Sequence, residues 1–92
     1  MRAISLMTLM ALSFGSAAAA PPEAAACAAC HGKDGKSVNP AWPNLNGQNK
    51  PYLVSSLKAY RDGSRNNPLM SPMAKSLSDE AIDALADYYS SQ

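Results

Sequence analysis

The run Cys27-Ala28-Ala29-Cys30-His31 contains both cysteines of this 92-residue chain and its single histidine. A chain of this length forms at most one small domain, and the apolar core of so small a domain rarely holds it folded alone. Natural proteins of this size therefore add a disulfide, a metal or a cofactor. The five-residue run is the candidate attachment point for such a stabilising group.

The pattern Cys-x-x-Cys-His is the attachment sequence for c-type haem. The residues before it are rich in alanine and favour a helix. On that helix Cys27 and Cys30 share one face because they are three residues apart. Each thiol can then reach one vinyl group of a porphyrin, and His31 is placed to ligate the iron. We therefore predict one haem c, bound covalently through two thioethers.

Three other interpretations of this motif fit the sequence less well. A thioredoxin-like redox pair lies at a strand-to-helix junction, and no alternating apolar stretch precedes Cys27. A structural zinc site needs four ligands, and the chain has no Cys or His beyond these three. A disulfide closing so small a loop would add little stability and would leave His31 without a role.

Residues 1–19 have the build of a secretory signal peptide. Arg2 precedes an apolar run of about twelve residues, and small residues follow from Gly15 to Ala20. A membrane span needs roughly twenty apolar residues, so an uncleaved anchor is the less favoured alternative. The sequence thus predicts a cleaved signal peptide over residues 1–19, one monohaem domain over residues 20–92, and export to the periplasm.

The composition excludes several classes of protein. With 47% hydrophobic and 16% charged residues, the chain is too apolar to be disordered. It is also too poor in Lys and Arg for an ordinary nucleic-acid-binding protein. Once Arg2 is removed with the signal peptide, seven basic side chains balance seven acidic ones. We therefore expect no nucleic-acid partner, and any electrostatic steering must come from local patches.

The rest of the chain is predicted to be helical with long loops. Helices are expected at residues 23–29, 50–62 and 79–90, and loops rich in proline, glycine and polar residues at 33–49 and 64–76. Asn49 is the expected cap of the second helix and Gly63 its end. Ser78 is the expected cap of the last helix. Its expected inward side chains are Ile82, Leu85, Ala86 and Tyr89.

The sixth iron ligand decides what a haem can do, and no second histidine is present to supply it. The remaining choices are Met70, Met73, a lysine amine, water or no ligand. A lysine is strongly hydrated and normally protonated, so it is a poor default. One methionine as ligand leaves the other as core filling, which is a common role of methionine. The residues by themselves leave the choice between the two open.

Several short motifs resemble, in the same order, those of class I cytochromes c of the small bacterial type. They are Cys27-Ala28-Ala29-Cys30-His31-Gly32, Asp34-Gly35, Pro43-Asn44-Leu45, Gly47-Gln48, Tyr52-Leu53, Arg61-Asp62-Gly63, Met70, Leu77-Ser78-Asp79 and Tyr88-Tyr89. The resemblance covers nearly all of residues 20–92. It implies an all-α fold, with about three helices and long loops wrapped around one covalently attached haem.

The same resemblance implies roles for two further residues. It makes Met70 the axial ligand opposite His31 and leaves Met73 as packing. It also implies that the carbonyl of Pro43 accepts the Nδ1 proton of His31 and so orients the ring. The predicted cofactor-binding residues are Cys27, Cys30, His31, Pro43 and Met70, with His31 and Met70 as the iron ligands.

One departure from the family is visible before the motif. The first helix is shorter than usual in this group, so we expect Tyr88 or Tyr89 to pack on it or on the haem in place of the usual helix crossing. Trp42, Arg61 and Arg65 are candidates to bond a haem propionate, but ordinary solvated or packing roles are favoured for each.

With both axial positions filled, no substrate can reach the iron, so the predicted function is electron transfer and not catalysis. We expect a periplasmic carrier that passes single electrons between respiratory partners by small, transient contacts. Contact with a membrane is expected only through partner complexes or an uncleaved N-terminal segment. The alternative is a five-coordinate haem protein with ligand-binding or peroxidase-like activity.

Overall fold

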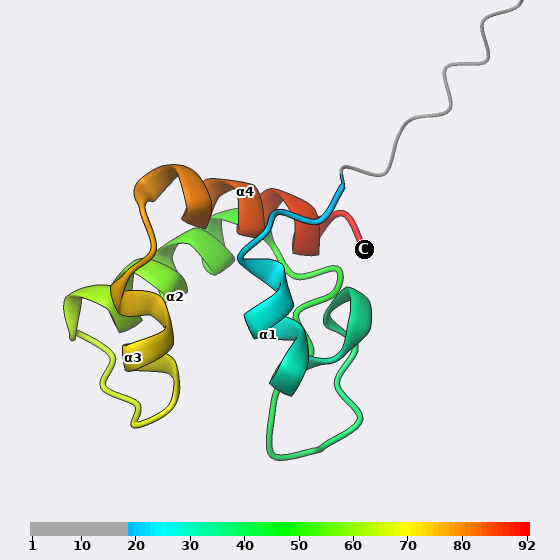
Figure 1. The fold of residues 1–92 in the computed structure, drawn as a ribbon, viewed down its shortest axis with the longest axis horizontal. Coiled ribbons are helices and arrows are strands. Elements are labelled where there is room, and N and C mark those ends of the chain that lie inside the picture. Colours follow the sequence, from blue (N-terminus) through cyan, green and yellow to red (C-terminus); the bar gives the residue numbers. More distant parts are fainter. Residues whose placement is uncertain (1–18) are drawn as a thin grey trace, which may run out of the picture.

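The computed structural model describes residues 19–92, in which every regular element is a helix. The elements are α1 (Ala24–His31), the short 3-10 helix η1 (Lys33–Gly35), α2 (Lys50–Asp62), α3 (Met70–Lys75) and α4 (Asp79–Ser90), as Figure 1 shows. Apart from Ala19, the predicted signal peptide lies outside the described residues. Over residues 19–92, no helix has the length and apolar character that a membrane crossing requires.

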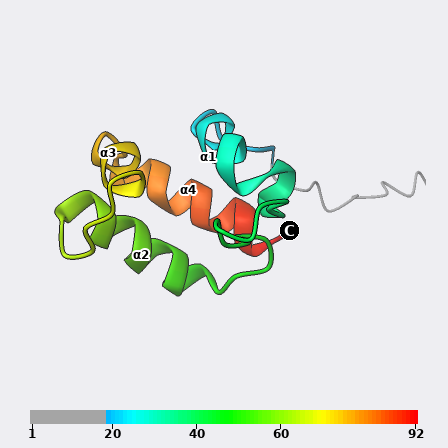
Figure 2. The same cartoon turned by 90° about the horizontal axis from the view of Figure 1, so that it is seen from below.

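Helices α2 and α4 pack side by side and form the frame of the molecule (Figures 1 and 2). Leu53 of α2 joins Leu85, Ala86 and Tyr89 of α4 and Ala24 of α1 in one buried cluster. In both views α1 and α3 lie toward opposite ends of the α2–α4 pair. The all-α architecture is therefore as predicted from the sequence, with the frame built from its two longest helices.

The bounds of α2 and α4 agree with the sequence prediction. The Ser78 hydroxyl accepts a hydrogen bond from the amide of Ala81 at 3.1 Å and so caps α4, as expected. Gly63 ends α2 in the left-handed region, with φ at 86°. Asn49 occupies the N-cap position of α2, but its side chain makes no capping hydrogen bond. The predicted side-chain cap at Asn49 is therefore wrong.

Helix α3 corrects the sequence prediction, which made residues 64–76 a loop. The side-chain oxygen of Asn67 accepts hydrogen bonds from the amides of Leu69 and Met70, both at 2.9 Å, and so supports the first turn. Pro72 lies within that turn, where amides lack an acceptor inside the helix, so its missing N–H costs no hydrogen bond. The proline that signalled a loop is thus compatible with a short helix.

An aromatic side chain of the last helix also bonds the first one. Tyr89 is 3% exposed, and its hydroxyl donates to the carbonyl of Ala24 at 3.5 Å. Gly32 follows His31 and ends α1 with φ at 81°. The sequence predicts that Tyr88 or Tyr89 packs either on the short first helix or on the haem. In the structure Tyr89 packs on the first helix.

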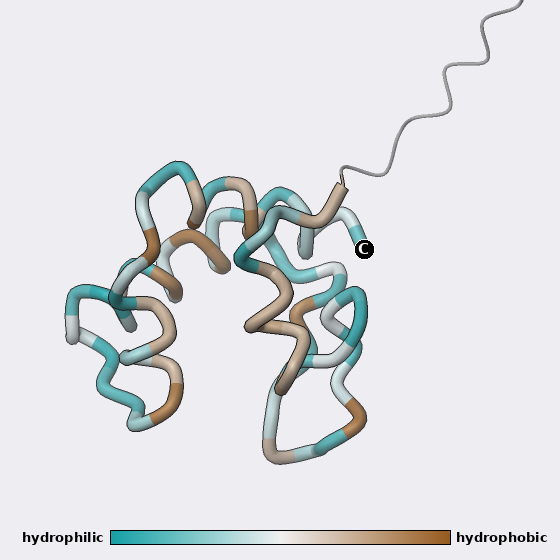
Figure 3. Tube along the Cα trace, in the orientation of Figure 1, coloured by the Kyte–Doolittle hydropathy of each residue, from teal (hydrophilic) through white to brown (hydrophobic). Residues whose placement is uncertain are grey.

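The buried core is small for a chain of this length. Ile82 and Leu85 are its largest fully buried side chains. Val38, Leu69 and Met73 are 97%, 59% and 46% exposed. Figure 3 shows hydrophobic residues reaching the lower ends of the loops as well as the helical frame. Apolar surface therefore remains uncovered on the segments that follow α1 and surround the start of α3.

Candidate functional site

Helix α1 places the two cysteines one helical turn apart. Cys30 is exposed and Cys27 is half-buried, and both are free thiols. Burial raises the pKa of the Cys27 thiol above its ordinary value. The Cys27 sulfur lies 3.7 Å from the carbonyl oxygen of Glu23, its partner one turn earlier in the chain. The two thiols thus stand on one short helical segment, as the spacing of the motif requires.

His31 is the last residue of α1 and is buried, with 6% of its surface exposed. Its Nδ1 lies 2.8 Å from the carbonyl oxygen of Pro43. Because a carbonyl can only accept, Nδ1 carries a proton, and Nε2 is the nitrogen that the neutral ring would offer to a metal. Histidine ligands of metals commonly donate their second nitrogen in this way, which fixes the tautomer and the ring orientation. The Pro43 carbonyl is the partner that the family resemblance implied.

The turn after His31 is tightly built. A Cβ on Gly32 would collide with the carbonyl of Lys36, in a backbone conformation that other residues rarely adopt. Asp34 also has a positive φ of 60°, and its carboxylate accepts a hydrogen bond from the Tyr88 hydroxyl at 3.2 Å. The chain that carries Pro43 is therefore held to α4 on one side and to His31 on the other.

Met70 and Met73 both lie on α3, one turn apart. Met70 is the first residue of the helix and is half-buried, whereas Met73 is 46% exposed. The structure thus places the predicted site residues in two groups, which lie toward opposite ends of the α2–α4 frame. Cys27, Cys30 and His31 lie on α1, with Pro43 bonded to His31, while Met70 lies on α3 toward the other end of the α2–α4 pair.

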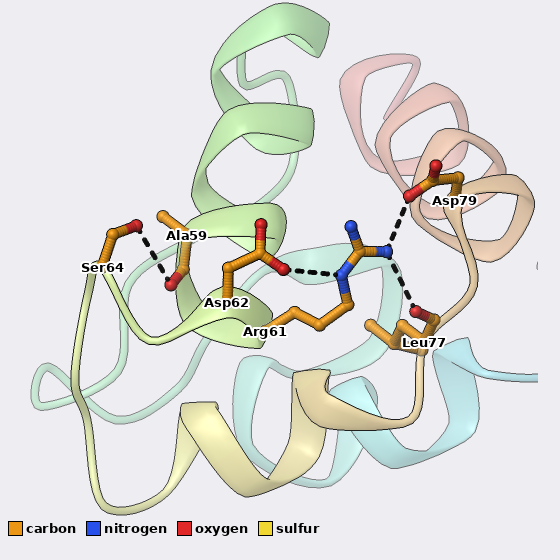
Figure 4. Close-up of polar contacts among 6 residues, drawn as sticks. All are labelled: Ala59, Arg61, Asp62, Ser64, Leu77 and Asp79. Atoms are coloured by element: carbon orange, nitrogen blue, oxygen red, sulfur yellow. Dashed lines mark hydrogen bonds and ion pairs between the residues drawn. The ribbon is translucent and has the colours of Figure 1, made fainter.

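The candidate propionate partners have other contacts in this structure. Arg61 bonds Asp62, Asp79 and the carbonyl of Leu77 (Figure 4). The guanidinium of Arg65 lies 4.4 Å from the centre of the Tyr60 ring and donates to the Ser56 hydroxyl. Both arginines therefore contact other groups of the described chain, and a bond from either to a propionate stays a prediction.

Sequence reasoning missed Asn67, which organises the start of α3 around Met70. Its side chain bonds the amides of Leu69 and Met70. The signal that could have found it is the tendency of an asparagine side chain to bond backbone amides two or three residues later in the chain. Pro68 and Pro72 mask that signal, because prolines in such a stretch favour a loop.

The residues present fit an iron porphyrin. Two free thiols, an imidazole with an available Nε2 and a thioether are the groups that attach and ligate a c-type haem. The exposed apolar side chains of Val38, Leu69 and Met73 suit an apolar macrocycle nearby. Within residues 19–92, no three His, Cys, Asp or Glu side chains gather as they would around a bare metal ion.

Comparison with known proteins adds independent findings. Residues 18–92 match the model of the family described as Cytochrome c. Cytochrome c-554(548) of Halomonas halodenitrificans is 56% identical over 81 residues, which cover 85% of this chain and 98% of the relative. The thiosulfate dehydrogenase electron acceptor of Thiomonas intermedia is 50% identical over 94 residues, which cover 97% of this chain and 43% of the relative.

A solved structure shares the fold as well. The cytochrome c4 of Acidithiobacillus ferrooxidans superposes with a TM-score of 0.69 at 37% sequence identity, over 73% of this chain and 38% of that one. The chain therefore spans nearly all of the cytochrome c-554(548) and less than half of the other two proteins.

Proposed function

Because this chain belongs to the cytochrome c family, carries haem c and transfers electrons through it, we propose that it is a periplasmic carrier with a six-coordinate His/Met haem. Haem c is bound covalently in this family, and Cys27 and Cys30 have the spacing of its attachment motif. The observation that carries the proposal is the 2.8 Å contact between His31 Nδ1 and the Pro43 carbonyl, directly after the two cysteines.

Each site residue has a distinct role in this proposal. Cys27 and Cys30 form the thioethers, His31 ligates through Nε2, and the Pro43 carbonyl holds the Nδ1 proton. Met70 would supply its thioether sulfur as the second protein ligand of the iron. When bound, the haem supplies a one-electron iron couple.

The ligand pair determines which chemistry is available. A methionine opposite a histidine favours ferrous iron and so raises the reduction potential. With these two residues as ligands the iron would have no position left for a substrate, so the chain would act as a carrier and not as a catalyst. The buried, hydrogen-bonded ring of His31 also limits movement of that ligand between the two oxidation states.

Location and partners complete the proposal. A signal peptide over residues 1–19 directs the chain to the periplasm, where it is cleaved. The partners are redox proteins that make small, transient contacts: a dehydrogenase or quinol-oxidising complex as donor, and a terminal oxidase or reductase as acceptor. The name of the Thiomonas relative supports a dehydrogenase as one class of donor.

The ligand assignment is tested by spectroscopy of the haem-loaded protein. The ferric protein should show the weak far-red band of methionine ligation, and the ferrous protein should ignore carbon monoxide at neutral pH. Met70→Ala should abolish the band, and Met73→Ala should keep it. Rapid carbon monoxide binding by the unmodified protein would instead favour the five-coordinate alternative, and loss of the band in Met73→Ala alone would reverse the assignment.

A further inference from the structure

Helix α3, which carries Met70, has little structure of its own to hold it in place. It contains six residues, and Ala74 is its only buried one. Isolated helices much shorter than about twelve residues are marginal in water because the first turn is costly to form. The position of Met70 must therefore be set by contacts that come from outside α3.

One such contact joins the end of α2 to the chain that leaves α3. Arg61, in the last turn of α2, donates from one terminal guanidinium nitrogen to the Leu77 carbonyl at 3.2 Å and to the Asp79 carboxylate at 2.7 Å (Figure 4). Its Nε also bonds Asp62 at 3.2 Å. The Leu77 amide in turn bonds the Ala74 carbonyl of α3 at 3.0 Å. Arg61 therefore fixes the C-terminal end of α3 relative to α2.

The N-terminal end of α3 is tied to the same part of α2. The Ser71 hydroxyl donates to the Arg65 carbonyl at 3.2 Å and accepts from the backbone N–H of Asn67 at 3.0 Å. The Arg65 amide bonds the Ala59 carbonyl of α2 at 3.0 Å. Both ends of α3 are thus attached to the C-terminal half of α2. Of these two attachments, the one through Arg61 uses a charged side chain.

We propose that Arg61 is a positioning residue for the sulfur of Met70. By holding the Leu77 carbonyl and the Asp79 carboxylate together, it sets the position of α3 and so how firmly Met70 occupies the sixth ligand position. This inference rests on the proposed His/Met ligation. It concerns a residue that reaches the iron only through α3. The planar guanidinium suits this role because its fixed donors can bond two acceptors at once, which a lysine ammonium does less well.

The test measures how easily an added ligand displaces Met70 from ferric iron. Imidazole is titrated into the haem-loaded protein and followed by absorbance, for the unmodified chain, Arg61→Gln and Arg61→Lys. Arg61→Gln should bind imidazole roughly tenfold more tightly, which corresponds to about 1.4 kcal/mol. Its reduction potential should fall, because weaker methionine ligation favours ferrous iron less. The imidazole affinity and reduction potential of Arg61→Lys should lie between those of the unmodified chain and Arg61→Gln.

Lys50→Gln is the matched control. Lys50 also joins α2 to α4, through Asp83 at 3.4 Å and Asp87 at 3.5 Å, but none of its ion pairs involves α3. This variant should lower the denaturant midpoint slightly and leave the imidazole affinity within about twofold, because exposed ion pairs contribute little. Equal changes in imidazole affinity for Arg61→Gln and Lys50→Gln would mean that Arg61 acts only on overall stability, and would overturn the inference.

The remaining outcomes separate the two proposals. A missing far-red band in the unmodified protein, or a band that survives Met70→Ala, refutes the ligand assignment itself. An intact band with unchanged imidazole affinity in Arg61→Gln refutes only the role of Arg61. Should Arg61→Gln fail to mature, Asp79→Asn replaces it, because it weakens one of the two bonds and keeps the other. It should give a smaller shift in the same direction, and no shift would contradict the role of Arg61.

Discussion

Tyr89 joins the first and last helices of this small fold. Its ring is buried, and its hydroxyl bonds the Ala24 carbonyl at the start of the helix that carries the cysteines. Burial raises the pKa of Tyr89 far above its ordinary value, so the hydroxyl remains a neutral donor at any physiological pH. Tyr89 therefore adds a hydrogen bond to the packing of Ala24 against the frame, where a longer N-terminal helix would have supplied a larger contact.

The pair formed by Arg61 and Asp79 leads to a prediction about pH. Hydrogen bonding and charge from Arg61 lower the pKa of Asp79 below its ordinary value of 3.8. A carboxyl whose pKa is lower in the folded state adds stability above its unfolded pKa and loses it as the pH falls through its folded pKa. We expect Asp79→Asn to melt at a lower temperature than the unmodified protein near neutral pH.

The difference in melting temperature should shrink as the pH falls below about 4, the range in which a free aspartate takes up its proton. Calorimetry of the two haem-loaded proteins from about pH 7 to about pH 3 measures it. The effect should be small because the Asp79 side chain is 66% exposed. A difference that stays constant down to the lowest pH would mean that the charge of Asp79 contributes nothing.

At the residue scale, the attachment site could be predicted because its parts are neighbours in sequence. Cys27, Cys30 and His31 acquire their spacing from one helical turn, which alanine-rich sequence favours. The choice between Met70 and Met73 could not be predicted from neighbouring residues in the same way. Both sulfurs lie on the same helix one turn apart, so the preference depends on how α3 is seated and not on either residue alone.

Two glycines that end helices permit a matched test at the scale of the elements. Gly32 after α1 and Gly63 after α2 have similar φ values of 81° and 86°. A Cβ on Gly63 would meet open space, whereas one on Gly32 would collide with the Lys36 carbonyl. Gly63→Ala should therefore cost about 1 kcal/mol, the price of the left-handed backbone alone.

Gly32→Ala should cost clearly more and should also reduce the yield of haem-loaded protein, because its turn sets the loop that reaches Pro43. Denaturant unfolding and the ratio of haem absorbance to protein mass measure the two effects. Similar unfolding free energies for both variants would show that the turn after His31 adapts without strain.

The helices themselves were predictable to different extents. Helices α2 and α4 have apolar stripes, α2 ends before Gly63, and α4 begins after its cap Ser78, so these bounds follow from local pattern. Helix α3 has no such stripe, and it is stabilised by Asn67, by a bond from Ser71 to the Arg65 carbonyl just after α2, and by packing against α2. A short helix of this kind is set by its surroundings, which is why local pattern predicted a loop there.

The size of the core leads to a prediction for the whole molecule. Seven hydrophobic residues are buried in the described chain, and three of them are alanines, namely Ala24, Ala74 and Ala86. So few apolar contacts rarely stabilise a chain of this length without a further group. The double variant Cys27→Ala/Cys30→Ala should therefore lose covalent haem and most of its far-ultraviolet circular dichroism signal for helix.

The unmodified protein from the same cells, with haem attached, serves as the control for this loss. Its helical signal should disappear in one cooperative transition on heating. A double variant that kept the full signal and the same transition would mean that the helical frame folds without the attached group.

The sequence by itself determined the chemistry of attachment and the two long helices, because both depend on residues within a few positions of one another. Tertiary structure decided what holds these parts together. Arg61 meets acceptors 16 and 18 residues away, and Tyr89 bonds a carbonyl 65 residues away. The packing of α2 on α4 sets the partners of Arg61, and the packing of α1 on α4 sets that of Tyr89, because packing fixes where distant carbonyls and carboxylates lie.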